Sequence, residues 1–356
     1  MNTSTSIYLD FIRFSSALLV CFYHASFLRF DGAWLKGIGA FGHDAVIIFF
    51  VLSGFVIGYV SQEREKSSIV FFLNRFSRLY SVVIPALILT LVLDYIGQQI
   101  SPAMYNGRHY EDSDPFFRLI SNLFFVNEIW FAHWRAFSNG PFWSLSYEFW
   151  YYVIFAAYFY FRGSKRLILT GIAVLIAGPK IMLLFPTWLL GYWLFTVSNK
   201  IKLNSIYSSI CVFLPIVIYS FYRYYDIDAV LLGFTIGAWG EDFVINKLYL
   251  SRYFINDYLV ALLLVVHLIG VISVSEYMRF TSVFTRVVRY GAGITFSLYL
   301  FHYPLFQFFG SIEKNSVVML MLSFLTIALL APYTEGKKKF YLGVFTRIFE
   351  KLGANK

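Results

Sequence analysis

The sequence predicts an all-α polytopic membrane protein, with about ten transmembrane helices around a central cavity. Of its 356 residues, 59% are hydrophobic and only 14% are charged, and its mean hydropathy is +0.65. These values lie far from those of soluble proteins. Apolar runs of about 20 residues, the length that crosses a bilayer as a helix, recur along the chain. We therefore expect one transmembrane domain over residues 1–356 and no separate soluble domain.

Ten apolar segments are predicted to cross the membrane, at 8–28, 42–61, 79–97, 147–161, 167–180, 183–198, 205–222, 258–275, 292–310 and 316–333. The segment 229–240 is apolar for only about twelve residues and is rich in glycine, which fits an interfacial or re-entrant piece better than a crossing. Two further loops, 98–146 and 223–257, are longer than simple connectors. We expect them to cover the outer mouth of a cavity, or to be simple insertions.

Charge indicates the orientation. With ten spans, most Lys and Arg residues fall on the side of both termini, including 337–339 near the C-terminus, so the positive-inside rule places both ends in the cytoplasm. This distribution explains the net charge of +9 without a nucleic-acid partner. Cys21 and Cys211 lie in apolar spans and form neither a disulfide framework nor a metal signature, so no metal is predicted. The first apolar run lacks a preceding basic segment, and we expect a retained span there rather than a signal peptide.

The first span contains three ionisable residues, Asp10, Arg13 and His24. At 100° per residue, Arg13 and His24 point within about 20° of each other and lie about 16 Å apart along the axis. Ionisable groups inside a span are costly and usually face a cavity. This helical face is therefore predicted to line a cavity, with polar functional groups extending from one leaflet toward the other. The alternative is a self-contained Asp10–Arg13 ion pair at the helix end, with His24 as a hydrogen-bonded packing residue.

Two arginines precede the third span, in the sequence FFLNRFSRLY. Arg75 and Arg78 are three residues apart and therefore share a helical face. Guanidinium groups bind phosphoryl oxygens bidentately, so this pair is a candidate site for an anionic cofactor that enters from the cytoplasm. An ordinary positive flank of a membrane span is the alternative.

A carboxylate precedes the fourth span, in the sequence WSLSYEFWYY. Glu148 and His24 are both predicted to lie toward the outer side, and a carboxylate that orients an imidazole makes it an effective general base. In the alternative interpretation, Ser144 caps the helix and Glu148 favours the positive end of its dipole.

Small and polar residues interrupt two other spans. Ser53 is followed by Gly54 and Gly58 in the second span, where close helix packing is the simpler interpretation. In the segment ITFSLYLFHYPLF, Tyr299 and His302 stand close to a proline that can open the helix and present polar groups to a cavity. A packed kink is the alternative there.

Taken in order, these segments resemble the acyltransferase-3 family of bacterial integral membrane acyltransferases. The resemblance runs nearly end to end through LDFIR and His24, FFVLSGF at 49–55, the Arg75 and Arg78 pair, WSLSYE at 143–148 and SLYLFHYPL at 297–305. The chain departs from the family where Asp44 and Ala45 replace a usual glycine, where no proline follows Arg78 closely, and where Gly336 rather than proline follows Glu335.

The resemblance implies transfer of an acyl group, usually acetyl, from cytoplasmic acyl-CoA to a hydroxyl of a glycan or other acceptor at the outer face of the bacterial inner membrane. His24, assisted by Glu148, is then expected to deprotonate the acceptor, with Arg75 and Arg78 on the CoA phosphates and Arg13 at the inner entrance. The expected substrate-binding residues are Asp10, Ser53, Ser144, Tyr147, Tyr299 and His302.

Two other functions fit the same polar residues. The first is a transporter or flippase for a glycan or lipid-linked sugar, although neither an inverted repeat nor a coupling-ion site is evident. The second is a membrane scaffold for envelope-polysaccharide assembly enzymes, which are also possible partners of an acyltransferase. Consumption of acyl-CoA separates the enzyme from both alternatives.

Overall fold

The computed structural model describes residues 2–107 and 110–351, and this part of the chain is built from helices without any strand. The helices are α1 (Thr3–Ala25), α2 (Lys36–Gly39), α3 (Gly42–Glu63), α4 (Ser68–Ile100), α5 (Pro115–Leu123), α6 (Trp143–Tyr160), α7 (Gly163–Ser198), α8 (Ser205–Tyr224), α9 (Ile227–Trp239), α10 (Phe254–Val274), α11 (Ser282–Gly293), α12 (Thr295–Ile312), α13 (Ser316–Leu330) and α14 (Lys338–Lys351). The all-α prediction is confirmed.

Seven helical stretches in the described residues are long and apolar enough to cross a membrane: α1, α3, α4, α7, α8, α10 and the stretch formed by α13 and α14. The ten predicted spans all fall on helices, because α7 contains two of them and α6 and α12, with 18 residues each, contain two more. The polytopic architecture is therefore confirmed. Helix α9 has 13 residues, a length of about 20 Å, which is shorter than the hydrocarbon core.

The two predicted spans 167–180 and 183–198 meet at Gly178 inside α7. This glycine has a φ of +79°, outside helical geometry, and a Cβ at this position would lie 2.6 Å from the Cα of Trp130. The carbonyl of Ala177 accepts a hydrogen bond from the backbone N–H of Trp130 at 3.0 Å, which satisfies a group that the kink leaves without a helical partner. The break therefore lies slightly before the predicted position, where the loop after α5 contacts it.

Polar side chains fix where several helices begin. Asn2, Ser67, Asn204, Thr281 and Asn315 each accept a hydrogen bond from a backbone N–H in the first turn of α1, α4, α8, α11 and α13. Because α4 starts after Ser67, it is longer than the predicted span 79–97. The two arginines predicted to precede that span therefore lie on the same continuous helix.

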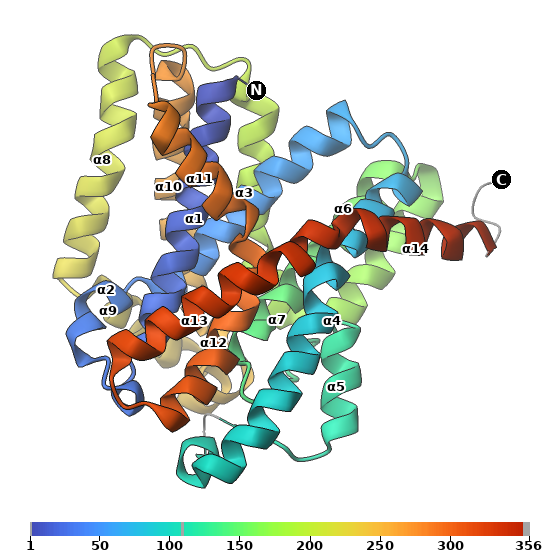
Figure 1. The fold of residues 1–356 in the computed structure, drawn as a ribbon. Coiled ribbons are helices and arrows are strands. Elements are labelled where there is room, and N and C mark those ends of the chain that lie inside the picture. The colour runs from blue at the N-terminus through green and yellow to red at the C-terminus, as the bar shows by residue number, and fades with distance from the viewer. Residues whose placement is uncertain (1, 108–109, 352–356) are drawn as a thin grey trace.

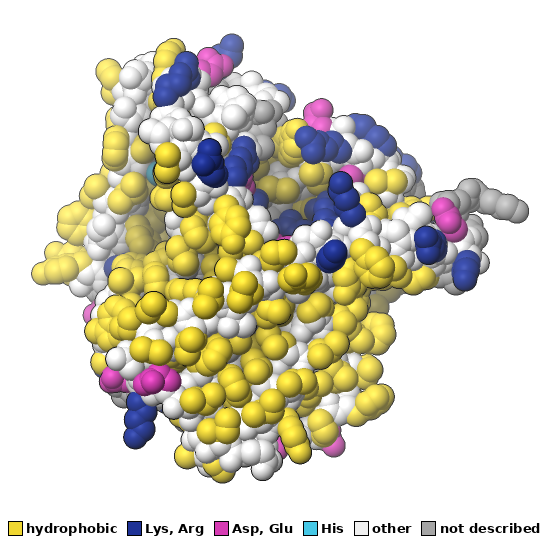
Figure 2. Space-filling view, viewed as in Figure 1, with side chains coloured by type: hydrophobic (Ala, Val, Ile, Leu, Met, Phe, Trp, Pro, Cys, Tyr) yellow, Lys and Arg dark blue, Asp and Glu magenta, His cyan; other side chains and the backbone are white. Residues whose placement is uncertain are grey.

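Both ends of the described chain lie in the upper half of Figure 1, and we call this the terminal side. The start of α1 is joined there to the end of α10, since Asn2 donates a hydrogen bond to Ser275 at 2.8 Å. On the opposite side, the start of α3 is joined to the start of α10 by His43 and Asp257, 2.9 Å apart. Figure 2 shows Lys and Arg side chains gathered on the terminal side around a hollow, above a surface that is almost entirely hydrophobic.

Helix α3 lies at the centre of the bundle and packs against α1, α6, α7 and α10. Its contact with α7 is close because Gly54 and Gly58 of α3 and Gly191 of α7 carry no side chains. A Cβ at Gly54 would lie 2.0 Å from the carbonyl oxygen of Trp188. The interpretation of these glycines as a packing notch is confirmed.

The Gly54→Ala variant is expected to lose about 1–3 kcal/mol of stability, because a methyl group there must push α3 and α7 apart. Thermal unfolding of the purified protein in detergent measures this loss. The matched control is Gly171→Ala in α7, where a Cβ meets nothing within 4 Å. Equal unfolding temperatures for the two variants would contradict the prediction.

Candidate active site

A cavity between α1, α3, α4, α6 and α12 contains most of the predicted site residues. Its volume is about 70 Å³, and its polar lining consists of Arg13, Ser53, Arg75, Arg78, Ser144, Glu148, Tyr152, Thr295 and Tyr299. We call it the arginine cavity. The fold thus brings together side chains that lie far apart in the sequence, from Arg13 in the first helix to Tyr299 near the end of the chain.

Glu148 is held in the arginine cavity by two hydroxyl groups. Ser53 of α3 donates to Glu148 Oε1 at 2.7 Å, and Tyr152, one turn along α6, donates to the same oxygen. The Ser53 hydroxyl oxygen in turn accepts from Trp188 Nε1 at 3.2 Å. Ser53 is therefore a positioning residue for the carboxylate, and its neighbouring glycines supply the close packing.

The two arginines of α4 have different environments. Arg75 is buried and forms an ion pair with Glu65, with Nη2 2.7 Å from Oε1. Its guanidinium also lies over the rings of Phe71 and Tyr152, 5.2 Å and 5.8 Å from their centroids. Arg75 is thus largely engaged by the protein itself.

Arg78, by contrast, has no hydrogen bond or ion pair with any residue in the described part of the chain. The carboxylates of Glu148 and Glu335 interact with it electrostatically. Lys338, at the start of α14, is also close enough to interact with Arg78 and Arg75. The arginine cavity therefore has one uncommitted guanidinium in its wall and a further cation nearby.

Asp10 and Arg13 form the predicted ion pair, with Arg13 Nη1 3.2 Å from Asp10 Oδ1. Asp10 also pairs with Arg289 of α11. The pair is therefore not self-contained, because Asp10 connects α1 to α11 while Arg13 lines the arginine cavity. Asp10 itself is not part of the cavity wall and acts as a partner that orients Arg13.

A second cavity, with a volume of about 260 Å³, lies toward the opposite side. Its polar and aromatic lining consists of Tyr23, His24, Phe27, His43, His133, Arg135, Trp143, Tyr249, Tyr299 and Tyr303. We call it the histidine cavity. Within the described residues its wall has three imidazoles and one guanidinium but no carboxylate.

His24 is oriented by a second histidine rather than by a carboxylate. Its Nδ1 lies 2.9 Å from His302 Nε2, and His302 Nδ1 lies 3.1 Å from the carbonyl oxygen of Leu298. Because a carbonyl can only accept, the proton of a neutral His302 is on Nδ1, and its Nε2 accepts from His24 Nδ1–H. The His302 ring is fully buried and has no carboxylate partner among the described residues, which favours its neutral form. His24 is thereby left with a lone pair on Nε2.

The two cavities share part of their walls. Val46 and Tyr299 line both of them. Tyr299 donates to the carbonyl oxygen of Pro141 at 3.0 Å, and its oxygen lies 2.7 Å from the hydroxyl of Ser144. The predicted residues Tyr299 and Ser144 thus form the partition between the arginine cavity and the histidine cavity.

Three expectations about Glu148 and its neighbours differ from the structure. Glu148 lines the arginine cavity and makes no hydrogen bond with His24, which lines the other cavity. The capping alternative is wrong, because α6 begins at Trp143 without a side-chain cap. Tyr147 is fully buried, bonds the hydroxyl of Ser251 at 2.7 Å and belongs to neither cavity wall. Neighbouring residues of α6 point to different faces of the helix. The motif alone does not indicate which of these faces lies against which cavity.

Tyr303 is a site residue that the sequence did not indicate, although it directly follows His302. Its ring packs edge-on against His24, with centroids 4.9 Å apart. Arg29 Nη2 donates to the Tyr303 hydroxyl oxygen at 2.6 Å, while the hydroxyl proton has no acceptor among the described residues. Tyr303 is therefore a buried donor beside His24, polarised by a cation.

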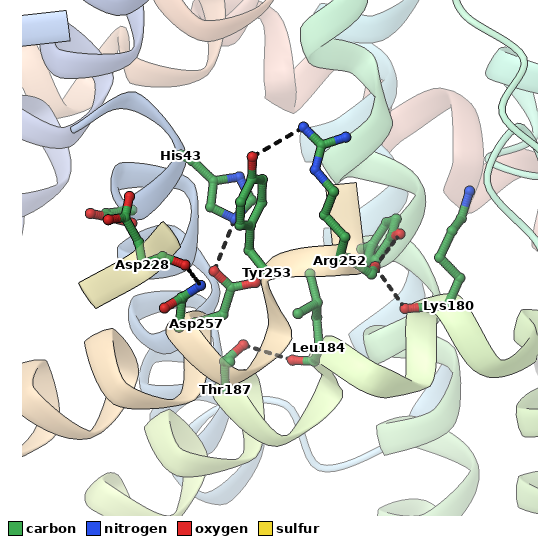
Figure 3. A network of polar contacts seen from close by, with 12 residues as sticks. His43, Lys180, Leu184, Thr187, Asp228, Arg252, Tyr253 and Asp257 are labelled. Carbon is green, nitrogen blue, oxygen red and sulfur yellow. Dashed lines mark hydrogen bonds and ion pairs between the residues drawn. The ribbon is translucent and has the colours of Figure 1, made fainter. Parts of the chain in front are cut away.

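His43 was also missed, because it stands at the start of a span where a polar residue is unremarkable. Figure 3 shows it pointing toward Asp257 of α10, 2.9 Å away. Its ring lies parallel to that of Trp143, with centroids 6.4 Å apart. The stacked rings of His43 and Trp143 thus line the same cavity as His24, and Asp257 is bonded to His43.

The family model described as an acyltransferase domain, that of acyltransferase-3, matches residues 6–334. The chain belongs to the acyltransferase-3 family. Among curated proteins and among solved structures, no significant match to this chain is found. The match includes both cavities and all eleven helices from α3 to α13, so the described site lies wholly within the acyltransferase domain.

Membership of the acyltransferase-3 family makes this chain a membrane acyltransferase, which requires an acyl donor and an acceptor. No group of three or more metal-ligating side chains is found within residues 2–107 and 110–351. The candidate acyltransferase site therefore consists of the arginine cavity and the histidine cavity. Val46 and Tyr299 form the wall that the two cavities share.

Proposed function

We propose that this protein transfers an acetyl group from cytoplasmic acetyl-CoA to a hydroxyl of a cell-envelope or exported glycan at the outer face of the bacterial inner membrane. Both termini lie in the cytoplasm in this proposal, and the arginine cavity is the donor side. The basic side chains gathered on the terminal side support that orientation through the positive-inside rule.

The observation that carries the proposal is the placement of two different chemistries in adjoining cavities. Arg78, which forms no hydrogen bond or ion pair with the described residues, suits a phosphate, and the nearby Lys338 adds to the positive charge. His24, with a free Nε2 lone pair, lies beyond the shared wall. A donor with an anionic head and a long flexible thioester arm matches this order of groups, with its head among the arginines and its acyl carbon near His24.

His24 is the proposed catalytic imidazole, acting through Nε2 as base or nucleophile. His302 and the Leu298 carbonyl hold the ring in the required tautomer. Glu148 acts in the donor cavity rather than on His24. It balances the positive charge of Arg13 and Arg78, with which it interacts electrostatically.

The test is a reaction of the purified protein with radiolabelled acetyl-CoA and a panel of hydroxylated envelope glycans. Release of CoA thiol and labelling of a glycan in equal amounts are expected. A flippase or a scaffold for polysaccharide-assembly enzymes would leave acetyl-CoA intact, and that result would refute the proposal. Mass spectrometry of the native envelope polymer, with and without the gene product, identifies the acceptor.

Tyr303 is expected to donate its proton to the carbonyl oxygen of the thioester as negative charge develops there. The Tyr303→Phe variant should lower kcat about 10²-fold with little change in KM, because one oxyanion donor is lost while the ring remains. Steady-state kinetics measure this effect. Tyr23→Phe removes another hydroxyl of the histidine cavity and provides the comparison; a larger loss there than at Tyr303 would contradict the assignment.

A further inference from the structure

A buried charged triad stands behind the histidine cavity, and none of the roles above uses it. Glu128, in the loop between α5 and α6, has its Oε1 2.6 Å from His133 Nδ1. Lys180, in the second half of α7, donates to the other carboxylate oxygen and to the carbonyl oxygen of Ala132. His133 lines the cavity, while the other two members lie behind it.

Stability does not explain this triad. Lys180 is fully buried and Glu128 is 1% exposed. Replacing such a pair by apolar residues is often neutral or stabilising, because desolvation offsets the attraction between the charges. The pair does, however, keep the carboxylate ionised: burial alone would raise the pKa of Glu128, but His133 and Lys180 hold it below its usual range.

The triad fixes the tautomer of His133. Because the Glu128 carboxylate can only accept, His133 Nδ1 carries a proton and Nε2 has the lone pair when the ring is neutral. Nε2 has no hydrogen-bond partner among the described residues. The ring is packed on Tyr249, with centroids 3.7 Å apart, and its side chain is 21% exposed. His133 is thus an imidazole with a fixed tautomer on the wall of the histidine cavity, and its Nε2 lone pair is available to accept a proton.

The three imidazoles that line the histidine cavity have different hydrogen-bond partners. His24 donates to a neutral histidine, which does little to stabilise a positive charge on its ring. His133 donates to the Glu128 carboxylate, which orients the ring as a carboxylate does for a general-base imidazole. His43 also has a carboxylate, but Asp257 Oδ2 is buried without a partner. Within the described part of the chain, no lysine or arginine pairs with Asp257 as Lys180 pairs with Glu128.

We propose that His133 is the general base that takes the proton of the acceptor hydroxyl, that Glu128 and Lys180 position it, and that His24 carries the acyl group. This inference rests on the proposed acyl transfer. It assigns to His133 the imidazole–carboxylate pair that the sequence predicted at His24 and Glu148. His24 and His133 line the same cavity, and in this proposal one acceptor hydroxyl lies between them.

The reaction has two balanced steps. First, Nε2 of His24 bonds to the thioester carbonyl carbon, the carbon–sulfur bond breaks, and the electron pair leaves with the CoA thiolate. Second, Nε2 of His133 takes the hydroxyl proton as the acceptor oxygen bonds to the acyl carbon, and the carbon–nitrogen bond to His24 breaks with its electron pair returning to Nε2. The proton then passes from His133 through solvent to the thiolate, which gives an ester and a thiol.

The titratable and charged groups around His133 come from five segments of the chain. Glu128 and Arg135 lie on its own loop, and Lys180 on α7. Tyr249 packs on its ring, and His24 and His43 line the same cavity from α1 and α3. Among these groups Glu128 is negatively charged, whereas Lys180 and Arg135 are positively charged.

A single-turnover experiment with labelled acetyl-CoA and acceptor separates the two steps. With His133→Gln, CoA thiol release close to one equivalent per protein and accumulation of label on His24 are expected, with transfer slowed at least about 10²-fold. His24→Ala should show neither release nor label. Wild-type protein without any transfer would refute the proposed function, whereas wild-type transfer rates in His133→Gln would refute only this inference.

The pH dependence of the transfer step gives an independent readout. A general base must be unprotonated to act, so transfer is expected to fall as pH decreases. Glu128→Gln removes the negative charge and should move the fall to lower pH by about one unit or more, while Lys180→Met removes the positive charge and should move it to higher pH. A purely structural role predicts no opposite shifts.

Two further variants are controls that separate these effects from a loss of folding. Glu128→Gln with Lys180→Met removes both buried charges together and should unfold near the wild-type temperature, with a transfer rate still below wild type. His267→Gln changes a histidine bonded to Tyr8 and the Val212 carbonyl, outside both cavities, and should leave the pH profile in place. Shifts of the same sign in Glu128→Gln and Lys180→Met would overturn the assignment.

Discussion

His24→Ala is expected to lower acyl transfer by about 10³-fold or more, because it removes the proposed catalytic imidazole. The change should not unfold the protein. His24 forms one side-chain hydrogen bond, to His302, and its ring is partly exposed to the histidine cavity. Initial rates of product formation at saturating acetyl-CoA measure the effect, with thermal unfolding as the check on folding.

Two further variants make the His24 result specific. His302→Gln can still accept from His24 Nδ1–H but changes the geometry, so an intermediate loss of rate is expected. His267→Gln should retain the wild-type rate, because that ring is bound to Tyr8 at 2.6 Å and lines neither cavity. Full activity in His24→Ala would remove His24 from the chemistry.

Arg78→Gln is expected to raise the KM for acetyl-CoA about 10- to 100-fold while kcat changes little. The reason is that Arg78 makes no ion pair with the described residues, so its loss removes binding of a ligand phosphate without leaving a buried charge unpaired. Steady-state kinetics with acetyl-CoA as the varied substrate give both constants.

Arg75→Gln should behave differently, although it lies on the same helical face. It would leave Glu65, which is 6% exposed, without its partner, and breaking a buried ion pair costs about 3–5 kcal/mol. Loss of stability is therefore expected at Arg75 and loss of donor affinity at Arg78. Arg64→Gln, at an exposed site outside the cavity, is the matched control. An unchanged KM in Arg78→Gln would contradict the assignment of the phosphate site.

Much of the candidate site was predictable from periodicity and spacing. Arg13 and His24 were expected on one face of the first helix, and the structure places them in two adjoining cavities along it. Arg75, Arg78 and Ser53 were expected to be functional for their chemistry, and all three line the arginine cavity. Their positions on each helix follow from periodicity along that helix, whereas their functional roles remain predictions.

Contacts between helices were harder to predict. Nothing in the sequence indicates whether Glu148 faces His24 or Ser53, since that depends on the rotation of α6 against α1 and α3. Lys180 offered a signal that was not used: an ionisable residue in an apolar span usually has a polar partner. That partner, Glu128, lies in a long loop 52 residues earlier.

The sequence alone determined that this protein is a bundle of membrane helices with arginines on one side and histidines within it, because apolar length and charge placement act locally. Only the tertiary structure decided that His133, and not His24, is paired with a carboxylate of the same long loop. That choice depends on the kink at Gly178 and on the loop carrying Glu128 and His133, which together bring Lys180 to the carboxylate. Such contacts arise from packing between distant segments, for which the sequence contains no local periodic signal.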